Sequence, residues 1–175
     1  MGNRLSKIVT KTGDDGSTGL ASGNRVSKAH DIIEAIGAID ELNSSIGVVR
    51  SVCQNQQLDD ELTMVQHQLF NCGGDLCLEG SMLISQEPIS LIEKSLEKYN
   101  NSLEPLKNFI LPGGTELTSR VHMSRSICRR AERRLVKAQE SYEFNPMVIV
   151  FINRLSDWLF VVARVTDESK EELWC

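Results

Sequence analysis

The residues best equipped for chemistry lie near the amino terminus, in the polar stretch from Thr10 to Leu20. This stretch contains Gly13, Gly16 and Gly19, together with several hydroxyl side chains and Lys11. Glycine lets backbone N–H groups approach a ligand closely, hydroxyls add hydrogen-bond donors, and lysine adds a positive charge. The combination predicts a cradle for an oligophosphate. The alternative is an exposed turn that carries glycine, aspartate and serine for ordinary conformational reasons.

This stretch differs from the common phosphate-binding loop of nucleotide hydrolases. A Walker loop needs a lysine and then a hydroxyl residue directly after its last glycine, whereas Lys11 precedes the glycines here. Asp14 and Asp15 argue against a site for phosphate alone, because their carboxylates would repel the phosphate group. They fit the hypothesis if they bind Mg²⁺ or fix the shape of the loop.

An arginine-rich helix, expected at residues 116–142, is the second candidate region. Its arginines are Arg120, Arg125, Arg129, Arg130, Arg133 and Arg134. Helical periodicity places four polar residues along one side, beside three small residues. The polar residues are Arg125, Arg129, Glu132 and Arg133, and the small ones are Ser124, Cys128 and Ala131. Small residues next to a row of guanidinium groups leave room for a ligand or another helix. Ordinary ion pairs in a solvated groove are the alternative.

Two further groups of residues are unusual for their surroundings. Asn153 and Asp157 lie one turn apart on an otherwise apolar helix. The segment Phe109–Gly114 predicts a hydrophobic hinge that ends in a Pro-Gly turn and leads into the arginine-rich helix. Patterning alone does not reveal whether Phe109 also lines a site.

Hydrophobic periodicity predicts five helices that would position these groups. They are expected at residues 27–53, 59–78, from Pro88 to about 103, 116–142 and 145–165. Thr115 is the expected cap of the fourth helix, and Asn145 followed by Pro146 is expected to start the fifth. The fifth helix is apolar on nearly all sides, which predicts a central or interface position. Since strand signals are almost absent, the predicted fold class is all-α: a five-helix bundle with an irregular amino-terminal arm.

The bulk properties of the chain narrow its class. Its 175 residues fit one domain, with an arm at 1–26, a bundle at 27–166 and a tail at 167–175. A net charge of −5 argues against a nucleic-acid partner. The sequence has neither a membrane-spanning apolar run nor an apolar signal core, so we expect a cytoplasmic protein. Its five cysteines suggest reduced thiols, and the spacing of Cys72, Cys77 and His67 fits no regular zinc pattern.

Four segments together resemble the PduO-type ATP:cob(I)alamin adenosyltransferases. They are Thr10 to Leu20, Glu34 to Ser44, Phe109 to Gly114 with Arg125 to Arg133, and Asn153 to Phe160. The similarity extends over essentially the whole chain, as far as Leu173 and Trp174. It implies an up-and-down five-helix bundle with ferritin-like packing that assembles as a homotrimer, with ATP at the subunit junctions and cobalamin beside it.

The resemblance also implies roles for individual residues. The ATP-binding residues would be Thr10, Lys11, Thr12, Gly13, Asp14, Gly16, Ser17, Thr18, Lys28, Arg129, Glu132 and Asn153. Phe109, Arg125 and Arg129 would be catalytic, with Phe109 closing off the lower face of the corrin. Arg125 would pair with Asp40 across the subunit boundary. Mg²⁺ would bind mainly through the ATP phosphates, with Glu132 as a candidate protein ligand.

Two positions depart from the family pattern. Ile32 and Ile36 stand where many members carry arginine and tyrosine, so the contacts of that arginine need not exist here. The other blocks are intact.

In the family reaction, reduced cobalamin attacks the ribose 5′ carbon of ATP and inorganic triphosphate leaves, so the protein needs no nucleophile of its own. The implied partners are a reductase and an adenosylcobalamin-dependent enzyme. Two other functions stay open. An ATP-dependent phosphotransferase would release ADP, whereas a non-catalytic cobalamin chaperone or helical interaction protein would not consume ATP.

Overall fold

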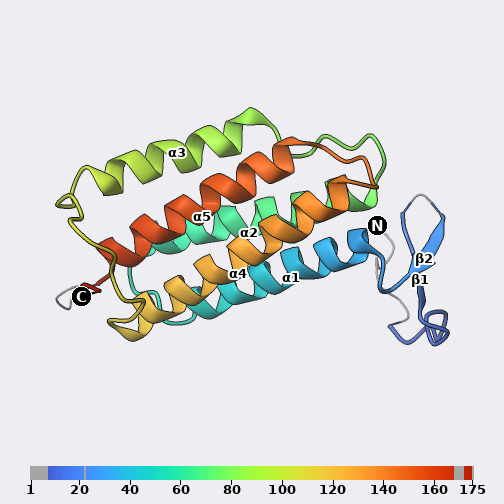
Figure 1. The fold of residues 1–175 in the computed structure, drawn as a ribbon, viewed down its shortest axis with the longest axis horizontal. Helices are drawn as coiled ribbons and strands as arrows, with labels where there is room; N and C mark the ends of the chain where they lie inside the picture. Colours follow the sequence, from blue (N-terminus) through green and yellow to red (C-terminus); the bar gives the residue numbers. More distant parts are fainter. Residues whose placement is uncertain (1–7, 22, 168–171, 175) are drawn as a thin grey trace.

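Five helices and one small hairpin form the fold of the computed structural model, which describes residues 8–21, 23–167 and 172–174. The helices are α1 (Asp31–Arg50), α2 (Gln56–Cys77), α3 (Gln86–Asn100), α4 (Glu116–Gln139) and α5 (Met147–Val165). They lie side by side, and successive helices run in opposite directions along the long axis (Figure 1). The predicted all-α, up-and-down five-helix bundle is therefore confirmed.

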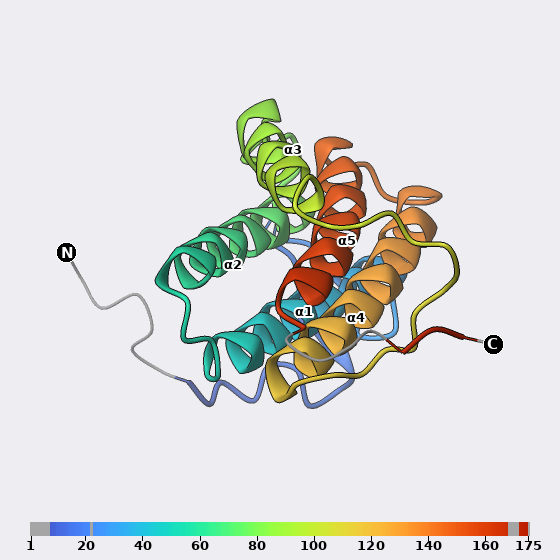
Figure 2. The same cartoon turned by 90° about the vertical axis from the view of Figure 1, so that its left-hand side faces the viewer.

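The helices pack in the spatial order α2, α1, α4, α5, α3. Figure 2 shows this arrangement end-on, with α3 on the outside of the bundle next to α5. The core between the helices contains large, fully buried side chains, among them Leu42, Leu62, Leu135 and Phe151. Burying each such side chain contributes about 1.5–3 kcal/mol of transfer free energy, so the core fixes the relative positions of the helices.

Local sequence signals define where several helices begin. The side chains of Asn55 and Thr115 each accept a hydrogen bond from an N–H in the first turn of α2 and α4, respectively. Such caps satisfy donors that a helix leaves unpaired at its start. The cap predicted at Thr115 is thus confirmed. At α5 the boundary shifts by one residue, because Pro146 is itself the cap while the Asn145 side chain accepts from the Met147 N–H at 3.0 Å.

The arm contains an antiparallel hairpin, which the sequence analysis did not predict. Strand β1 (Ser17–Gly19) pairs with β2 (Arg25–Ser27), and Thr18 lies opposite Val26. These strands are three residues long and contain few strong strand formers, so their sequences give little strand signal. Because β2 occupies residues 25–27, the first helix begins at Asp31 and not at residue 27.

A buried carboxylate fastens the connection between α2 and α3. Oδ1 of Asp75 accepts hydrogen bonds from the Ser81 hydroxyl and the Leu83 N–H, both at 2.7 Å. Oδ2 accepts from the Ile84 N–H at 2.9 Å and from the Asn145 amide at 2.7 Å. Burial by itself would raise the pKa of Asp75, but these donors outweigh it and hold the pKa below its ordinary value. The connection is thereby tied to the residues that precede α5.

Among the described residues, no helix is both long enough and apolar enough to cross a membrane. Four cysteines in this part of the chain are free thiols: Cys53, Cys72, Cys77 and Cys128. Cys175 and residues 168–171 of the predicted tail lie outside the described residues.

Candidate active site

The polar stretch of the arm folds around a cavity of about 530 Å³. Of the predicted ATP-binding residues, those that line the cavity are Thr10, Lys11, Thr12, Gly13, Asp14, Ser17, Thr18 and Lys28. Lys28 donates a hydrogen bond from Nζ to the carbonyl oxygen of Gly13 at 2.7 Å. The structure therefore brings the predicted loop residues and Lys28 together around one concave, polar surface.

Two glycines of this loop have conformational reasons to be glycine. A Cβ at Gly13 would lie 3.1 Å from both Nζ of Lys28 and the carbonyl oxygen of Ser17, which is too close for an ordinary contact. Gly16 does not line the cavity. It has a φ of +81°, a conformation that side-chain-bearing residues rarely adopt, and it forms the turn into β1. Gly13 permits close approach, while Gly16 shapes the turn.

Arg25 is a cavity residue that the sequence analysis missed. Its guanidinium group donates from Nε to the Ser17 hydroxyl at 3.0 Å and from Nη2 to the Thr12 carbonyl oxygen. These bonds join β2 to two separate points of the loop. Only a prediction of the hairpin could have revealed this role, because the bonds depend on pairing between β1 and β2.

Asp15 bonds within the loop and does not line the cavity. Its carboxylate accepts hydrogen bonds from the backbone N–H of Ser17 at 2.9 Å and from the Ser17 hydroxyl at 2.8 Å. The same bonds lower its pKa, the backbone bond contributing most. Asp15 therefore fixes the shape of the loop, whereas Asp14 lines the cavity.

The arginines of α4 divide into two groups with different environments. The first group faces α1, where Arg130 pairs with Glu41 and Arg134 with Glu34 at 3.7 Å. Arg120 pairs with Glu116 of its own helix and donates to the Val48 carbonyl oxygen of α1 at 3.0 Å. Ordinary ion pairs, the alternative considered above, account for this side of the helix.

Arg125, Arg129 and Arg133 form the second group, spaced one turn apart along α4; Arg125 is partly buried against α5, whereas Arg129 and Arg133 are exposed. None of them makes an ion pair within the part of the chain that the structure describes. Nε of Arg125 is buried and has no hydrogen-bond partner there, and the guanidinium lies 5.9 Å from the centre of the Phe160 ring. Desolvation and the nearby charge of Arg129 lower the pKa of Arg125. Because a half-buried cation without a carboxylate is costly, this face suits an anionic group.

Asn153 of α5 completes this second face. Its amide nitrogen donates to Oε1 of Glu132 on α4 at 2.8 Å, and its amide oxygen accepts from Arg154 at 2.9 Å. Arg154 in turn bonds to Glu93 of α3 at 2.8 Å. The chain of contacts fixes the orientation of the Asn153 amide. Within the described ranges, Glu132 therefore bonds to Asn153 and forms no ion pair with an arginine of α4.

The predicted ATP-binding residues therefore fall in two places in this single chain. The arm lies at one end of the bundle, beside the start of α1 (Figure 1). Among the described residues, no hydrogen bond or ion pair joins the arm to Arg125, Arg129, Glu132 or Asn153. Asp40 is exposed on α1 and makes no ion pair with Arg125 within the described chain.

Phe109 lies in the connection between α3 and α4, with its side chain 76% exposed. Residues 109–111 pair with residues 172–174: the Trp174 N–H donates to the Phe109 carbonyl oxygen, and the Leu111 N–H donates to that of Glu172, both at 2.8 Å. The Phe109 and Trp174 rings meet edge to face with centres 6.5 Å apart. Two neighbouring exposed aromatic rings form an apolar surface suited to a large flat ligand. Trp174 was not among the predicted site residues.

Comparison with known proteins assigns this arrangement to a family. A family model described as cobalamin adenosyltransferase matches residues 8–166. The chain belongs to this family. It is 43% identical to a cobalamin adenosyltransferase of Cupriavidus metallidurans over 178 residues, covering 99% of this chain and 97% of the relative. It is 42% identical to the corrinoid adenosyltransferase of Bacillus subtilis, with 92% of this chain and 86% of the relative covered.

Solved structures of cobalamin adenosyltransferases share the fold. A phenylalanine-to-alanine variant of a PduO-type ATP:corrinoid adenosyltransferase from Lactobacillus reuteri, complexed with cobalamin and ATP, matches with a TM-score of 0.92. It is 36% identical, and the match covers 96% of this chain and 99% of that one. An arginine-to-lysine variant from the same organism, complexed with ATP, has a TM-score of 0.91, with 37% identity and coverage of 96% and 100%. The family resemblance inferred from the four sequence segments is confirmed, and the chain is a transferase.

Proposed function

We propose that this chain transfers the 5′-deoxyadenosyl group of ATP to the cobalt of cob(I)alamin, giving adenosylcobalamin and inorganic triphosphate. Family membership, the named relatives and the neighbours complexed with ATP and cobalamin support this reaction. Within the chain, the observation that carries the proposal is the row of Arg125, Arg129 and Arg133, since their charges have no carboxylate partner among the described residues. An oligophosphate is the anion that such a row would bind.

We infer that a complete site requires two subunits of a homotrimer. The arm of one subunit would cover the α4–α5 face of its neighbour, so that Lys28 and the loop amides meet Arg129 and Asn153 around one ATP molecule. Asp40 would approach Arg125 of the adjacent subunit. Two observations support this arrangement: the two groups of site residues are separate within one chain, and Arg125 has a buried Nε without a partner in the described chain.

The protein side of the proposed reaction consists of alignment and charge. Lys28, Arg129 and the backbone N–H groups around Gly13 would offset negative charge that accumulates on the departing triphosphate. Asn153, whose amide is oriented by Glu132 and Arg154, would hold the nucleoside end. Positioning of this kind can lower the activation barrier by about 7–11 kcal/mol, because the reactants already lose their translational and rotational entropy when they bind, before the chemical step.

The residues present also fit a Mg²⁺ ion bound with ATP. Oε1 of Glu132 accepts from Asn153, and within the described chain no hydrogen bond involves Oε2. Mg²⁺ commonly binds through one or two carboxylates together with substrate phosphates, so one carboxylate oxygen is an adequate protein contribution. When bound, the ion would neutralise phosphate charge.

Phe109 would close the lower face of the corrin. Its ring offers no atom that can coordinate a metal, and it would exclude both water and the cofactor's own base. Cobalt is easier to reduce when neither water nor the base is bound to it. The exposed ring of Phe109 would therefore assist reduction of the bound cobalamin. The contact with Trp174 would restrict the motion of the ring.

The test is a reaction of the purified protein with ATP, Mg²⁺ and chemically reduced cobalamin under anaerobic conditions. Adenosyl transfer predicts the spectral change of a cobalt–carbon bond together with release of triphosphate. Release of ADP would indicate a phosphotransferase, and cobalamin binding without ATP consumption would indicate a chaperone. We also propose a cytoplasmic location, because the four cysteines in the described part of the chain are free thiols. The proposed partners are a reductase and an adenosylcobalamin-dependent enzyme.

A further inference from the structure

A second cavity, of about 330 Å³, lies between α2 and α3. None of its lining residues belongs to the arm or to α4, so it is distinct from the residues proposed for adenosyl transfer. It arises because α3 packs chiefly against α5, which leaves space between α3 and α2. Its volume is at the lower end of the range of small-molecule pockets.

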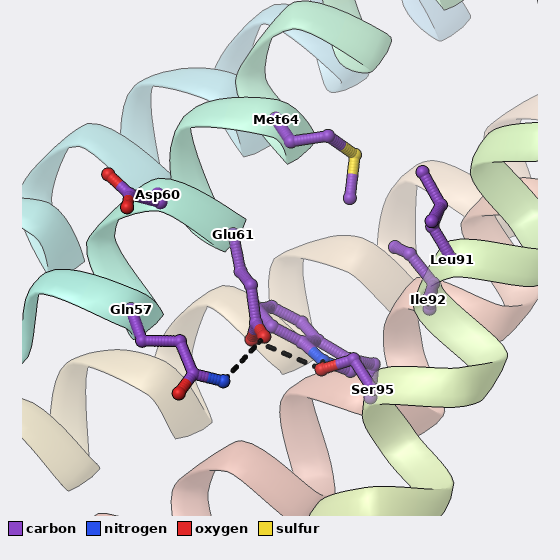
Figure 3. A pocket seen from close by; sticks show the side chains of 8 residues that line it. Gln57, Asp60, Glu61, Met64, Leu91, Ile92 and Ser95 are labelled. Atoms are coloured by element: carbon purple, nitrogen blue, oxygen red, sulfur yellow. Dashed lines mark hydrogen bonds between the residues drawn. The ribbon is translucent and has the colours of Figure 1, made fainter.

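The walls of this cavity are mainly apolar. Met64 of α2 and Leu91 and Ile92 of α3 lie on opposite sides of it, as Figure 3 shows. Trp158 of α5 is almost fully buried and contributes to the lining. A ring or a short aliphatic group would therefore find contacts on several sides.

Glu61 places one carboxylate in this apolar setting. Its Oε2 accepts hydrogen bonds from the Ser95 hydroxyl at 3.1 Å and from the Tyr99 hydroxyl at 2.9 Å. Ser95 in turn accepts a bond from Nε1 of Trp158 at 2.9 Å. This network fixes the position of the Glu61 side chain, which points toward Ser95 in Figure 3. Desolvation and the bond to Glu61 raise the pKa of Tyr99, so its hydroxyl remains a donor.

The other oxygen of Glu61 is far less occupied. Oε1 accepts from the Gln57 amide at 3.4 Å, which is a long and weak hydrogen bond. No ion pair of Glu61 with lysine or arginine occurs within the described ranges. The neighbouring Asp60 also lines the cavity, but its carboxylate is turned away from Glu61 in Figure 3 and accepts from Gln56 at 2.8 Å.

We propose that this cavity binds a small organic cation, namely a protonated amine attached to a compact apolar body. The ammonium group would donate to Oε1 of Glu61, while the apolar body would contact Met64, Leu91 and Trp158. A neutral ligand would leave the carboxylate partly desolvated without a compensating charge, and an anion would be repelled by it. Charge complementarity and the apolar walls together select this class of ligand.

Phenethylammonium chloride is a suitable probe, with phenethyl alcohol as its neutral counterpart of similar shape. Binding is followed by NMR of the full-length protein carrying isotope-labelled methionine methyl groups, and the Met64 signal is assigned by its loss in Met64→Leu. We expect the cation to shift the Met64 signal saturably and to bind about tenfold or more tightly than the alcohol, as a hydrogen bond to a charged group predicts.

The variant Glu61→Gln keeps the shape of the side chain but removes its charge, so the preference for the cation over the alcohol should disappear. Glu87→Gln is the matched control and should retain the preference, because Glu87 is exposed on α3 and does not line the cavity. Leu91→Trp should abolish both shifts by filling the cavity, which tests the location even if Glu61→Gln folds poorly. Equal affinities for cation and alcohol, an unchanged preference in Glu61→Gln, or no saturable shift would each overturn the proposal. The measurement involves neither ATP nor cobalamin, so its outcome is independent of the proposed adenosyl transfer.

Discussion

Replacing Asp75 by asparagine is expected to lower the free energy of unfolding by about 3–5 kcal/mol. Each carboxylate oxygen of Asp75 accepts two hydrogen bonds, whereas asparagine has only one oxygen. If the new NH₂ group takes the Oδ1 position, Ser81 can rotate its hydroxyl to accept, but the Leu83 N–H loses its acceptor. If it takes the Oδ2 position, the N–H of Ile84 and the amide of Asn145 lose theirs.

The magnitude follows from these losses. A buried donor left without an acceptor costs about 1–3 kcal/mol, and each surviving bond weakens by roughly 1 kcal/mol when the acceptor is no longer charged. The measurement is urea unfolding at neutral pH and fixed protein concentration, because assembly makes apparent stability depend on concentration. Asp60→Asn, an exposed change on the same helix, is the control and should stay within about 0.5 kcal/mol of the parent protein.

The pH dependence gives a second readout. Because the pKa of Asp75 is lowered by folding, its ionised form stabilises the protein at pH values above its ordinary pKa of 3.8. This contribution is lost as the pH falls through the lower value of the folded state, so the difference between parent and Asp75→Asn should narrow in acid. A variant as stable as the parent at neutral pH would contradict the role assigned to the four hydrogen bonds.

Three predictions concern the proposed reaction. Arg129→Ala should raise KM for ATP about tenfold or more, whereas Arg134→Ala, which removes an arginine paired with Glu34, should leave it nearly unchanged. The same KM for ATP in Arg129→Ala and Arg134→Ala would show that Arg129 does not contribute to ATP binding. Phe109→Ala should leave KM for ATP unchanged but lower kcat when the reaction starts from Co(II), which must be reduced in the site. A rise in KM for ATP as large as the fall in kcat would contradict this role of Phe109. Arg25→Ala should raise KM for ATP with little change in kcat, because the hydrogen bonds from Arg25 to Ser17 and Thr12 are lost. Arg25→Lys should restore part of the affinity for ATP. A fall in kcat without a change in KM would point to a different role.

Much of the helical framework could be predicted from the sequence. The apolar positions of α2, from Leu62 to Leu76, repeat with helical spacing and are buried as expected. Thr115 is a cap recognisable from residue type alone. These features depend on neighbours within one turn, which is why a linear pattern reveals them.

Features that depend on distant contacts could not be predicted in this way. Asp75 lies in an apolar stretch of α2, and its role requires donors from a connection and from the residue before α5. Arg25 acts only once the hairpin has formed, and hairpins with three-residue strands carry little signal. Periodicity also could not divide the α4 arginines into paired and unpaired groups, because the acids that pair with Arg130 and Arg134 lie on α1.

The packing of α3 against α5 has a consequence for synthesis on the ribosome. Ile89 and Ile92 of α3 are almost fully buried in the finished bundle, yet the helix they pack against is translated last. At about 5–20 residues per second, several seconds separate the emergence of α3 from that of α5. During that interval Ile89 and Ile92 have no partner helix, so this side of the bundle can close only after the last helix has been made.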